Sequence, residues 1–418
     1  MKPWKTIGII AVFMTVFSAL PAQQADYLIR NTRYTDSLKA ELDTSRQVLE
    51  RYDLHFWLAE ELMAVNANEC LEHTREAIRF CRQLGDAYYL GYLINLEANC
   101  YDDLGQYQRA IDKYEEAIEV TYHTMLNQVG DTLAELQCDL AAYYNNLGYS
   151  YFNLGQYNRA FEYYLRSIDM GTEHDCPDLA TVYGSVAELF FAVGDVQRAR
   201  EFIQRARKVD LGPDAEEPLM EISIIGDIYL AEGKLDSATW FFEKLLDTSR
   251  WWITNYDLVI AYRGLSEVGI QSGDLSMAIT NAEKCYQTAR YLDNKIYQAS
   301  ALRQLGQAQL LSGNSPGAQE HLLESVRIAE ETRSIGELHQ GYDLLSAFHA
   351  HENNFRSAFD FRMKAGVIQD SLRARDRANF LALTMLNREL QTREKEASVL
   401  EQQLLRERRL VRNSVSFG

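Results

Sequence analysis

The sequence predicts an all-α protein, a solenoid of about seven to eight stacked helix pairs followed by one long C-terminal helix. A glycine recurs after one step of 50 residues and then after steps of about 40, which is typical of stacked repeats. Hydrophobic residues make up 47% of the chain and there are only six prolines, which suits long helices. The recurring position is occupied by Gly105, Gly155, Gly194, Gly233, Gly273 and Gly313, and by Asn353 in degenerate form.

The N-terminal segment, residues 1–22, has the pattern of a secretory signal peptide. Lys2 and Lys5 precede an apolar run over Ile7–Leu20, and Pro21-Ala22 offers a cleavage edge. A run of about 14 apolar residues is short for a membrane span, although an uncleaved anchor is the alternative. The first cysteine after it is Cys70, so a lipoprotein anchor is not expected. We expect an exported, periplasmic protein or, alternatively, one at the periplasmic face of the inner membrane.

The segments that follow are expected in a fixed order. Residues 23–34 form a polar lead-in, and residues 35–370 form the solenoid. Within it, 35–86 is a divergent N-terminal cap, 87–332 holds the clearest repeats and 335–370 is a degenerate last repeat, since terminal repeats usually depart from consensus. Residues 210–217 and 248–256 are expected to be connectors, the second containing Trp251-Trp252.

The clearest unit is the segment Ala142–Ser167, which predicts a helix, a turn and a returning helix. Gly148 and Ala160 are small enough to let two helix backbones approach, while Tyr151 and Tyr164 fill the space beside them. Gly155 supplies the positive φ that ends the first helix.

This unit resembles the tetratricopeptide repeat, whose pattern is Leu-Gly, a Tyr three residues on, a turn Gly, an aromatic residue and spaced Ala residues. The resemblance covers about 300 residues and implies a right-handed superhelix with a concave groove, lined by the first helix of each pair. The positions that carry it are Gly105, Ala110, Gly148, Tyr151, Gly155, Ala160, Gly194, Ala199, Gly226, Gly233, Ala238, Gly273, Gly306 and Gly313.

The resemblance also implies which residues face the groove. Asparagine can bond a peptide backbone through both its donor and its acceptor. Arg263 and Arg303 lie at equivalent positions 40 residues apart, which favours a carboxylate or an acidic segment as ligand. The basic set with which some family members hold a terminal carboxylate is not reproduced. The groove candidates are Asn95, Asn99, Asn145, Tyr149, Glu188, Asp227, Arg263, Glu267 and Arg303.

Residues 371–412 predict one long charged helix, because this stretch contains no Gly or Pro, and 413–418 form a tail. A heptad pattern predicts a coiled-coil homodimer through Leu383–Val411, although Arg393 and Glu407 occupy core positions. The alternative is a single amphipathic helix that caps the last repeat. The apolar heptad positions are Leu383, Leu386, Leu390, Ala397, Leu400, Leu404 and Val411.

A second resemblance is carried by Asp370-Ser371-Leu372 and the charged run Arg393–Arg412. Together with exported repeats, these are similar to the sensory halves of bacterial membrane-bound histidine kinases and DNA-binding regulators. Those families continue into a transmembrane span, whereas this sequence ends at Gly418 without an apolar run of about 18 or more residues after the charged helix. Two hypotheses follow: a free, non-enzymatic exported scaffold for sensing or assembly that binds a protein or peptide, or a sensory ectodomain truncated before its membrane span.

Motifs for catalysis or cofactor binding are not found. The chain has no GxxxxGK[ST], no GxGxxG after a strand and no HExxH. The short cluster His349-Ala350-His351-Glu352 and the pair Cys70 and His73 lack a complete set of metal ligands. A formal charge of −18 makes nucleic acid a poor partner. We therefore expect no cofactor, no metal and no catalytic residue.

The six cysteines show no CxxC and no regular framework. Cys70 and Cys81 would lie about 16 Å apart on one helix, too far to bridge. Cys70 could pair with Cys100 across neighbouring helices, since export permits oxidation, or the thiols could stay free and buried. The sequence leaves both open.

Overall fold

A computed structural model describes residues 32–209, 219–246 and 255–376, apart from 64 and 127, together with a few residues between 379 and 395. The predicted signal peptide, most of the polar lead-in, Trp251-Trp252, most of the heptad and the tail lie outside the described residues. Within the described ranges all regular elements are helices, and none is long and apolar enough to cross a membrane.

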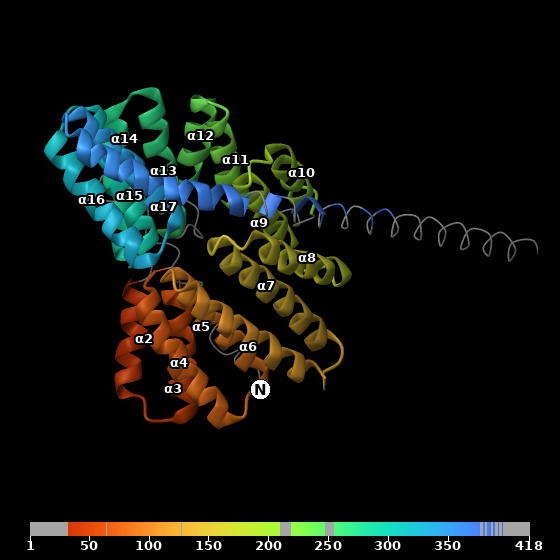
Figure 1. Cartoon of the computed structure of the whole chain (residues 1–418). Helices are drawn as coiled ribbons and strands as arrows, with labels where there is room; N and C mark the ends of the chain where they lie inside the picture. Colours follow the sequence, from red (N-terminus) through yellow and green to blue (C-terminus); the bar gives the residue numbers. More distant parts are fainter. Residues whose placement is uncertain are drawn as a thin grey trace, which may run out of the picture.

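Helices stack in antiparallel pairs along the chain, as Figure 1 shows. Residues 355–376 form the last helix, which pairs with α17. Counting from α3, the described residues form eight pairs, so the predicted all-α solenoid is confirmed. The helices are α2 (Thr32–Thr44), α3 (Val48–Leu62), α4 (Ala67–Leu84), α5 (Ala87–Asp103), α6 (Tyr107–Met125), α7 (Asp131–Asn153), α8 (Tyr157–Glu173), α9 (Leu179–Ala192), α10 (Val196–Ala206), α11 (Leu219–Ala231), α12 (Leu235–Leu245), α13 (Asn255–Ser272), α14 (Leu275–Tyr291), α15 (Lys295–Leu311), α16 (Ser315–Thr332) and α17 (Ile335–His351).

The turns inside the pairs share one backbone conformation. The six recurring glycines have φ between 69° and 83°, and Asn353 has φ 57°. Left-handed backbone of this kind ends a helix without steric cost only at glycine, and asparagine tolerates it best among the other residues. In four turns the next residue then caps the following helix: Asp195, Asp274, Asn314 and Asn354 each accept a bond from a backbone N–H three residues on.

Helix-facing glycines allow the two helices of a pair to touch. A Cβ at Gly148 would lie 2.6 Å from the Tyr164 ring, and one at Gly306 would lie 2.7 Å from Leu322. Phe242, which is fully buried, lies against Gly226 on one side and Gly264 on the other. Each glycine therefore makes room for a large side chain of a neighbouring helix.

Two boundaries differ from those expected. Three helices, α2 to α4, precede the first clear repeat, and α2 begins at Thr32, inside the expected lead-in. The last helix runs without a break from 355 to 376, so residue 370 is not a boundary. The single 50-residue step arises from long helices, since α6 has 19 residues and α7 has 23.

The last helix returns across the stack toward α7 and α8, as Figure 1 shows. Asn379 donates to the carbonyl of Gly155 at 3.1 Å. Leu383 is 1% exposed and joins the buried cluster that contains Phe161 and Val186. The first predicted heptad position is thus covered by its own chain and does not face a second chain. The prediction was wrong at Leu383 because the sequence pattern does not distinguish a partner helix from the solenoid itself.

A long-range contact closes the stack. The carbonyl oxygen of Asp103, at the end of α5, accepts bonds of 2.9 Å from both the Tyr256 hydroxyl and the Asn294 amide. Asn294 also donates to the Tyr256 hydroxyl at 3.1 Å. We call Asp103, Tyr256 and Asn294 the closing contact, because they join the second helix pair to the sixth and seventh.

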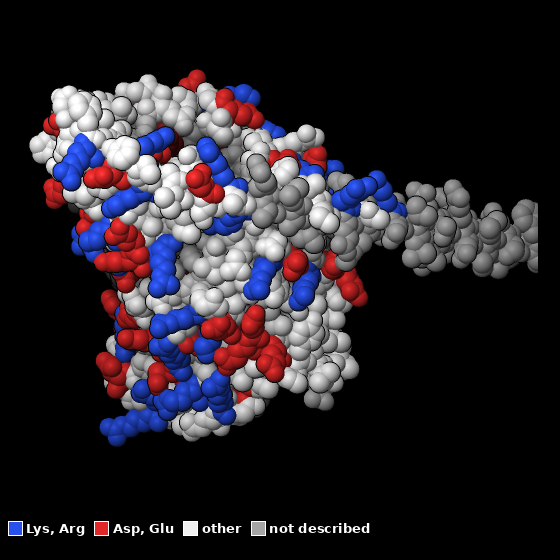
Figure 2. All heavy atoms as spheres, in the orientation of Figure 1, with Lys and Arg blue, Asp and Glu red and all other residues white. Residues whose placement is uncertain are grey.

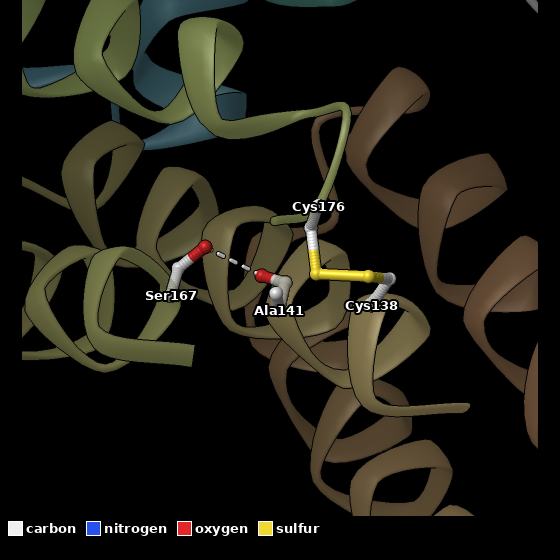
Figure 3. Close-up of a disulfide and its surroundings, with 4 residues drawn as sticks. All are labelled: Cys138, Ala141, Ser167 and Cys176. Carbon is white, nitrogen blue, oxygen red and sulfur yellow. Dashed lines mark hydrogen bonds between the residues drawn. A yellow bond between two sulfur atoms is a disulfide. The ribbon is translucent and has the colours of Figure 1, made fainter. Parts of the chain in front are cut away.

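A disulfide joins Cys138 of α7 to Cys176, which lies just before α9, as Figure 3 shows. The hydroxyl of Ser167 donates to the carbonyl of Ala141 at 2.6 Å in the same region. Among the described residues, Cys70, Cys81, Cys100 and Cys285 are buried free thiols. The pair Cys70 and Cys100 that the sequence left open is therefore not bonded, and the disulfide joins two cysteines that the sequence analysis did not single out.

Candidate functional site

Five side chains meet on the inner helices of the solenoid. Arg263 of α13 donates to both carboxylate oxygens of Asp227 of α11, at 3.2 and 3.3 Å. Tyr297 of α15 interacts with Arg263, with Tyr149 of α7 and with Glu188 of α9. All five remain partly exposed. We call Tyr149, Glu188, Asp227, Arg263 and Tyr297 the inner cluster.

The electrostatics of the inner cluster follow from its partial removal from water. The pKa of Glu188 is raised to about 7, chiefly by desolvation and next by the charge of Asp227, while Arg263 opposes both effects. Asp227 is also the largest cause of the raised pKa of Arg263. Desolvation likewise raises the pKa of Tyr297 to about 12. The cluster is therefore close to neutral below pH 7 and carries one net negative charge above it.

Three predicted groove residues are buried in the described structure. Asn95 is 6% exposed, Asn145 is 9% exposed and Arg303 is 8% exposed. Asn146 of α7 donates to the amide oxygens of Asn95 and Asn99, at 3.3 Å each. The expectation of groove-facing side chains does not hold at these three positions, because neighbouring first helices pack closely enough to cover them.

Three charged candidates, Arg263, Glu267 and Arg303, are hydrogen-bonded within the chain. Arg303 donates to Glu337 at 2.8 Å, and Glu267 accepts from Gln304 at 3.3 Å. With Arg263 held by Asp227, both guanidinium groups already carry a carboxylate. The prediction that Arg263 and Arg303 bind an acidic ligand is therefore not supported, because carboxylates of adjacent repeats already pair with both guanidinium groups.

Sequence reasoning missed the tyrosines at the starts of α13 and α15. Tyr256 and Tyr297 contribute to the electrostatic surroundings of Tyr149, as does Tyr107 at the start of α6. Tyr256 and Tyr297 are about 40 residues apart and each lies in the first turn of its helix. Their recurrence at the same place in two repeats could have identified them. The groove positions taken from the resemblance begin further along the helix and therefore did not include them.

The face of the molecule in Figure 2 offers no single sign of charge. Figure 2 shows Lys and Arg interspersed with Asp and Glu over the face turned to the reader. Over the ranges that the structure describes, no group of three or more His, Cys, Asp or Glu is arranged to hold a metal ion. The inner cluster is therefore the candidate site that combines aromatic and ionisable groups from several repeats.

Glu188 makes stability depend on pH. Its pKa of about 7 in the folded chain exceeds the ordinary value of 4.5, so the folded state binds this proton more tightly than the unfolded state. Stability should fall as pH rises from about 4.5 to 7. Glu188→Gln should thus match the wild type at pH 4.5 and exceed its free energy of unfolding by roughly 1–3 kcal/mol at pH 8. Urea unfolding at both pH values measures this difference.

The exposed Glu320 supplies the control for that experiment. Glu320→Gln should leave the free energy of unfolding nearly unchanged at both pH values. An equal gain for Glu188→Gln at pH 4.5 and pH 8 would show that titration of Glu188 is not the cause.

Comparison with known families gives two matches, both described as tetratricopeptide repeat. One model matches residues 139–211 and the other residues 96–126. These segments contain the clearest unit and the repeat before it. A comparison with curated protein sequences gives no significant match.

Solved structures with a similar fold include two Rap proteins. One is a Rap protein complexed with competence and sporulation factor, with a TM-score of 0.55, 16% identity and coverage of 82% of this chain and 93% of that chain. The other is the Rap conjugation gene regulator of the plasmid pLS20 in complex with the Phr* peptide, with a TM-score of 0.57, 13% identity and coverage of 82% and 93%. At these identities the likeness concerns the fold.

Proposed function

Because the chain is a tetratricopeptide-repeat protein, we propose that it is a non-enzymatic scaffold that binds a peptide segment at the inner cluster. The observation that carries this proposal is the meeting of five partly exposed aromatic and ionisable side chains from five inner helices. Two solved structures of similar fold are complexes with a factor or a peptide, which supports a peptide as the ligand class.

The charge of the inner cluster favours a peptide with a cationic group. Asp227 and Arg263 neutralise each other, and Glu188 is left with a pKa near neutrality. A lysine, arginine or amino terminus beside Glu188 would stabilise its ionised form, so binding should release a proton near pH 7. The Tyr149 and Tyr297 rings would contribute apolar and cation–π contact.

A peptide selection tests this proposal. Peptides selected from a random library on the purified chain should be enriched in Lys and Arg. By calorimetry at pH 8, Glu188→Gln should weaken their binding at least tenfold, whereas Glu320→Gln should not. At pH 7, where Glu188 is only partly ionised, heats measured in two buffers of different ionisation enthalpy should show proton release with the wild type only. Selected peptides that bind the wild type and Glu188→Gln equally would place the ligand elsewhere.

For the compartment, we propose an exported protein that acts in sensing or assembly. The signal-like segment 1–22 supports export, and the Cys138–Cys176 disulfide suits an oxidising compartment. N-terminal sequencing of the protein isolated from its own host cell should begin at Gln23, whereas an intact Met1 would favour an anchored form. The alternative role, the sensory ectodomain of a membrane-bound histidine kinase or DNA-binding regulator, is supported by Asp370-Ser371-Leu372 and the charged helix. A continuous reading frame into a membrane span and an output domain would favour it.

A further inference from the structure

The last helix carries a row of exposed apolar side chains. Phe355, Phe359, Met363 and Val367 are spaced four residues apart and are 68%, 63%, 54% and 70% exposed. At this spacing they cover one side of the helix over about three turns. We call these four residues the outer stripe.

The opposite side of the same helix is already packed. Ala358 and Ala365 are buried, and Phe361 and Ile368 pack against the cluster that contains Tyr342 and Leu345 of α17. The outer stripe therefore does not belong to the core of the chain. Terminal repeats of a solenoid need a polar outer face to stay soluble, and this terminal repeat presents an apolar one. We therefore expect another chain to cover the outer stripe.

A glycine lies within the outer stripe. Gly366 is three residues from Met363 and seven from Phe359, so it shares their side of the helix. A Cβ added at Gly366 would meet no atom of the chain within 4 Å, so the packing of the chain itself does not require glycine here. Glycine in a helix interior costs about 0.5–1 kcal/mol relative to alanine. A glycine at such a place favours the close approach of another backbone.

We propose that the outer stripe is a homodimer interface, in which two copies of the last helix pack antiparallel across a two-fold axis. The stripe is self-complementary in this arrangement. Phe355 lies opposite Val367 of the second copy, and Phe359 lies opposite Met363 of the second copy. Such an isologous contact uses the same patch twice, as most homodimers do.

Charge also favours a second copy as the occupant. Asp360 and Lys364 lie on one flank of the stripe, four residues apart and of opposite sign. Residues on the same flank face each other across an antiparallel pair, so Asp360 of each copy lies beside Lys364 of the other. On the opposite flank, Arg362 is neutralised by Asp343. Arg356 also lies on this side, four residues before Asp360, so the contact surface carries charge of both signs and two copies of this acidic chain can meet here without a surplus of negative charge.

Sedimentation equilibrium of the full chain tests the interface. The wild type should be a dimer at micromolar concentration. Phe359→Glu should raise the dimer dissociation constant at least 100-fold, because the charge is introduced twice per interface. Leu311→Glu, at a 56% exposed leucine of α15, is the control and should leave the dimer unchanged. A wild type that is monomeric at 100 µM, or a dimer that survives Phe359→Glu, would overturn the proposal.

Two glycines provide a second matched pair of variants. Gly336, near the start of α17, also has nothing within 4 Å of an added Cβ. Gly366→Leu should abolish the dimer, whereas Gly336→Leu should not, and both should keep the helical circular dichroism of the wild type. Equal effects of the two substitutions would contradict a close helix approach at Gly366.

A charge exchange distinguishes a second copy from another protein partner. Asp360→Lys should weaken the dimer by placing Lys364 of the second copy beside a lysine, and Lys364→Asp should weaken it by the reverse repulsion. The double variant Asp360→Lys/Lys364→Asp should recover at least half of the lost dimer affinity, in logarithmic units. Weakening by both single changes without recovery in the double variant would refute the antiparallel register.

Discussion

Phe242→Ala is expected to lower the free energy of unfolding by about 3–5 kcal/mol. The ring is fully buried and lies between Gly226 of α11 and Gly264 of α13, so no side chain of those two residues can move into the space it leaves. The change removes apolar contact and creates a cavity at the junction of two repeats. Urea unfolding followed by circular dichroism measures the loss.

The control lies on the same helix. Trp240 is 56% exposed, so Trp240→Ala removes a larger side chain but should lower the free energy of unfolding by less than about 1 kcal/mol. Gly264→Ala tests the same junction from the other side. Its Cβ would lie 2.5 Å from the Phe242 ring, so overpacking should lower stability by about 1–3 kcal/mol. A junction that tolerated both Phe242→Ala and Gly264→Ala would not be packed as described.

Removing the disulfide with Cys138→Ala/Cys176→Ala should lower the free energy of unfolding by about 2–4 kcal/mol. The two cysteines are 38 residues apart, so the bond restricts a long loop of the unfolded chain. It also fastens α7 to the segment that leads into α9. Urea unfolding of both proteins without reductant measures the effect.

Reductant separates the bond from the substitutions. Dithiothreitol should bring the wild type to the stability of the double variant and leave the double variant unchanged. The free buried thiols Cys70, Cys81, Cys100 and Cys285 are common to both proteins, so they cancel in the comparison. The prediction would be contradicted if dithiothreitol left the stability of the wild type unchanged. Titration of the free thiols confirms in that experiment that the disulfide is completely reduced.

Local features of this fold could be predicted from sequence because each depends on few neighbouring residues. The turn at Gly155 needs only a positive φ, and its step of about 40 residues repeats along the chain. The contact between Gly148 and Tyr164 likewise lies within one helix pair. These features explain why the all-α solenoid could be predicted.

Long-range features could not be predicted, since they depend on the rotation that accumulates over several repeats. Leu383 returns to the core beside Phe161, more than 200 residues earlier, and a heptad pattern does not encode that path. The pairing of Arg303 with Glu337 arises in the same way, from the offset between neighbouring repeats. Four members of the inner cluster were among the groove candidates named from the sequence, whereas Tyr297 was not.

The closing contact has a mechanical consequence. An open stack of repeats behaves as a spring, in which each junction can rotate independently and the ends are free to separate. Here the carbonyl of Asp103 is bonded to Tyr256 and Asn294, so the intervening pairs form a closed loop. In a closed loop the rotations at successive junctions must sum to a fixed value. A peptide that twists one junction therefore has to produce an opposite twist at another, and the loop transmits strain around its circumference without lengthening.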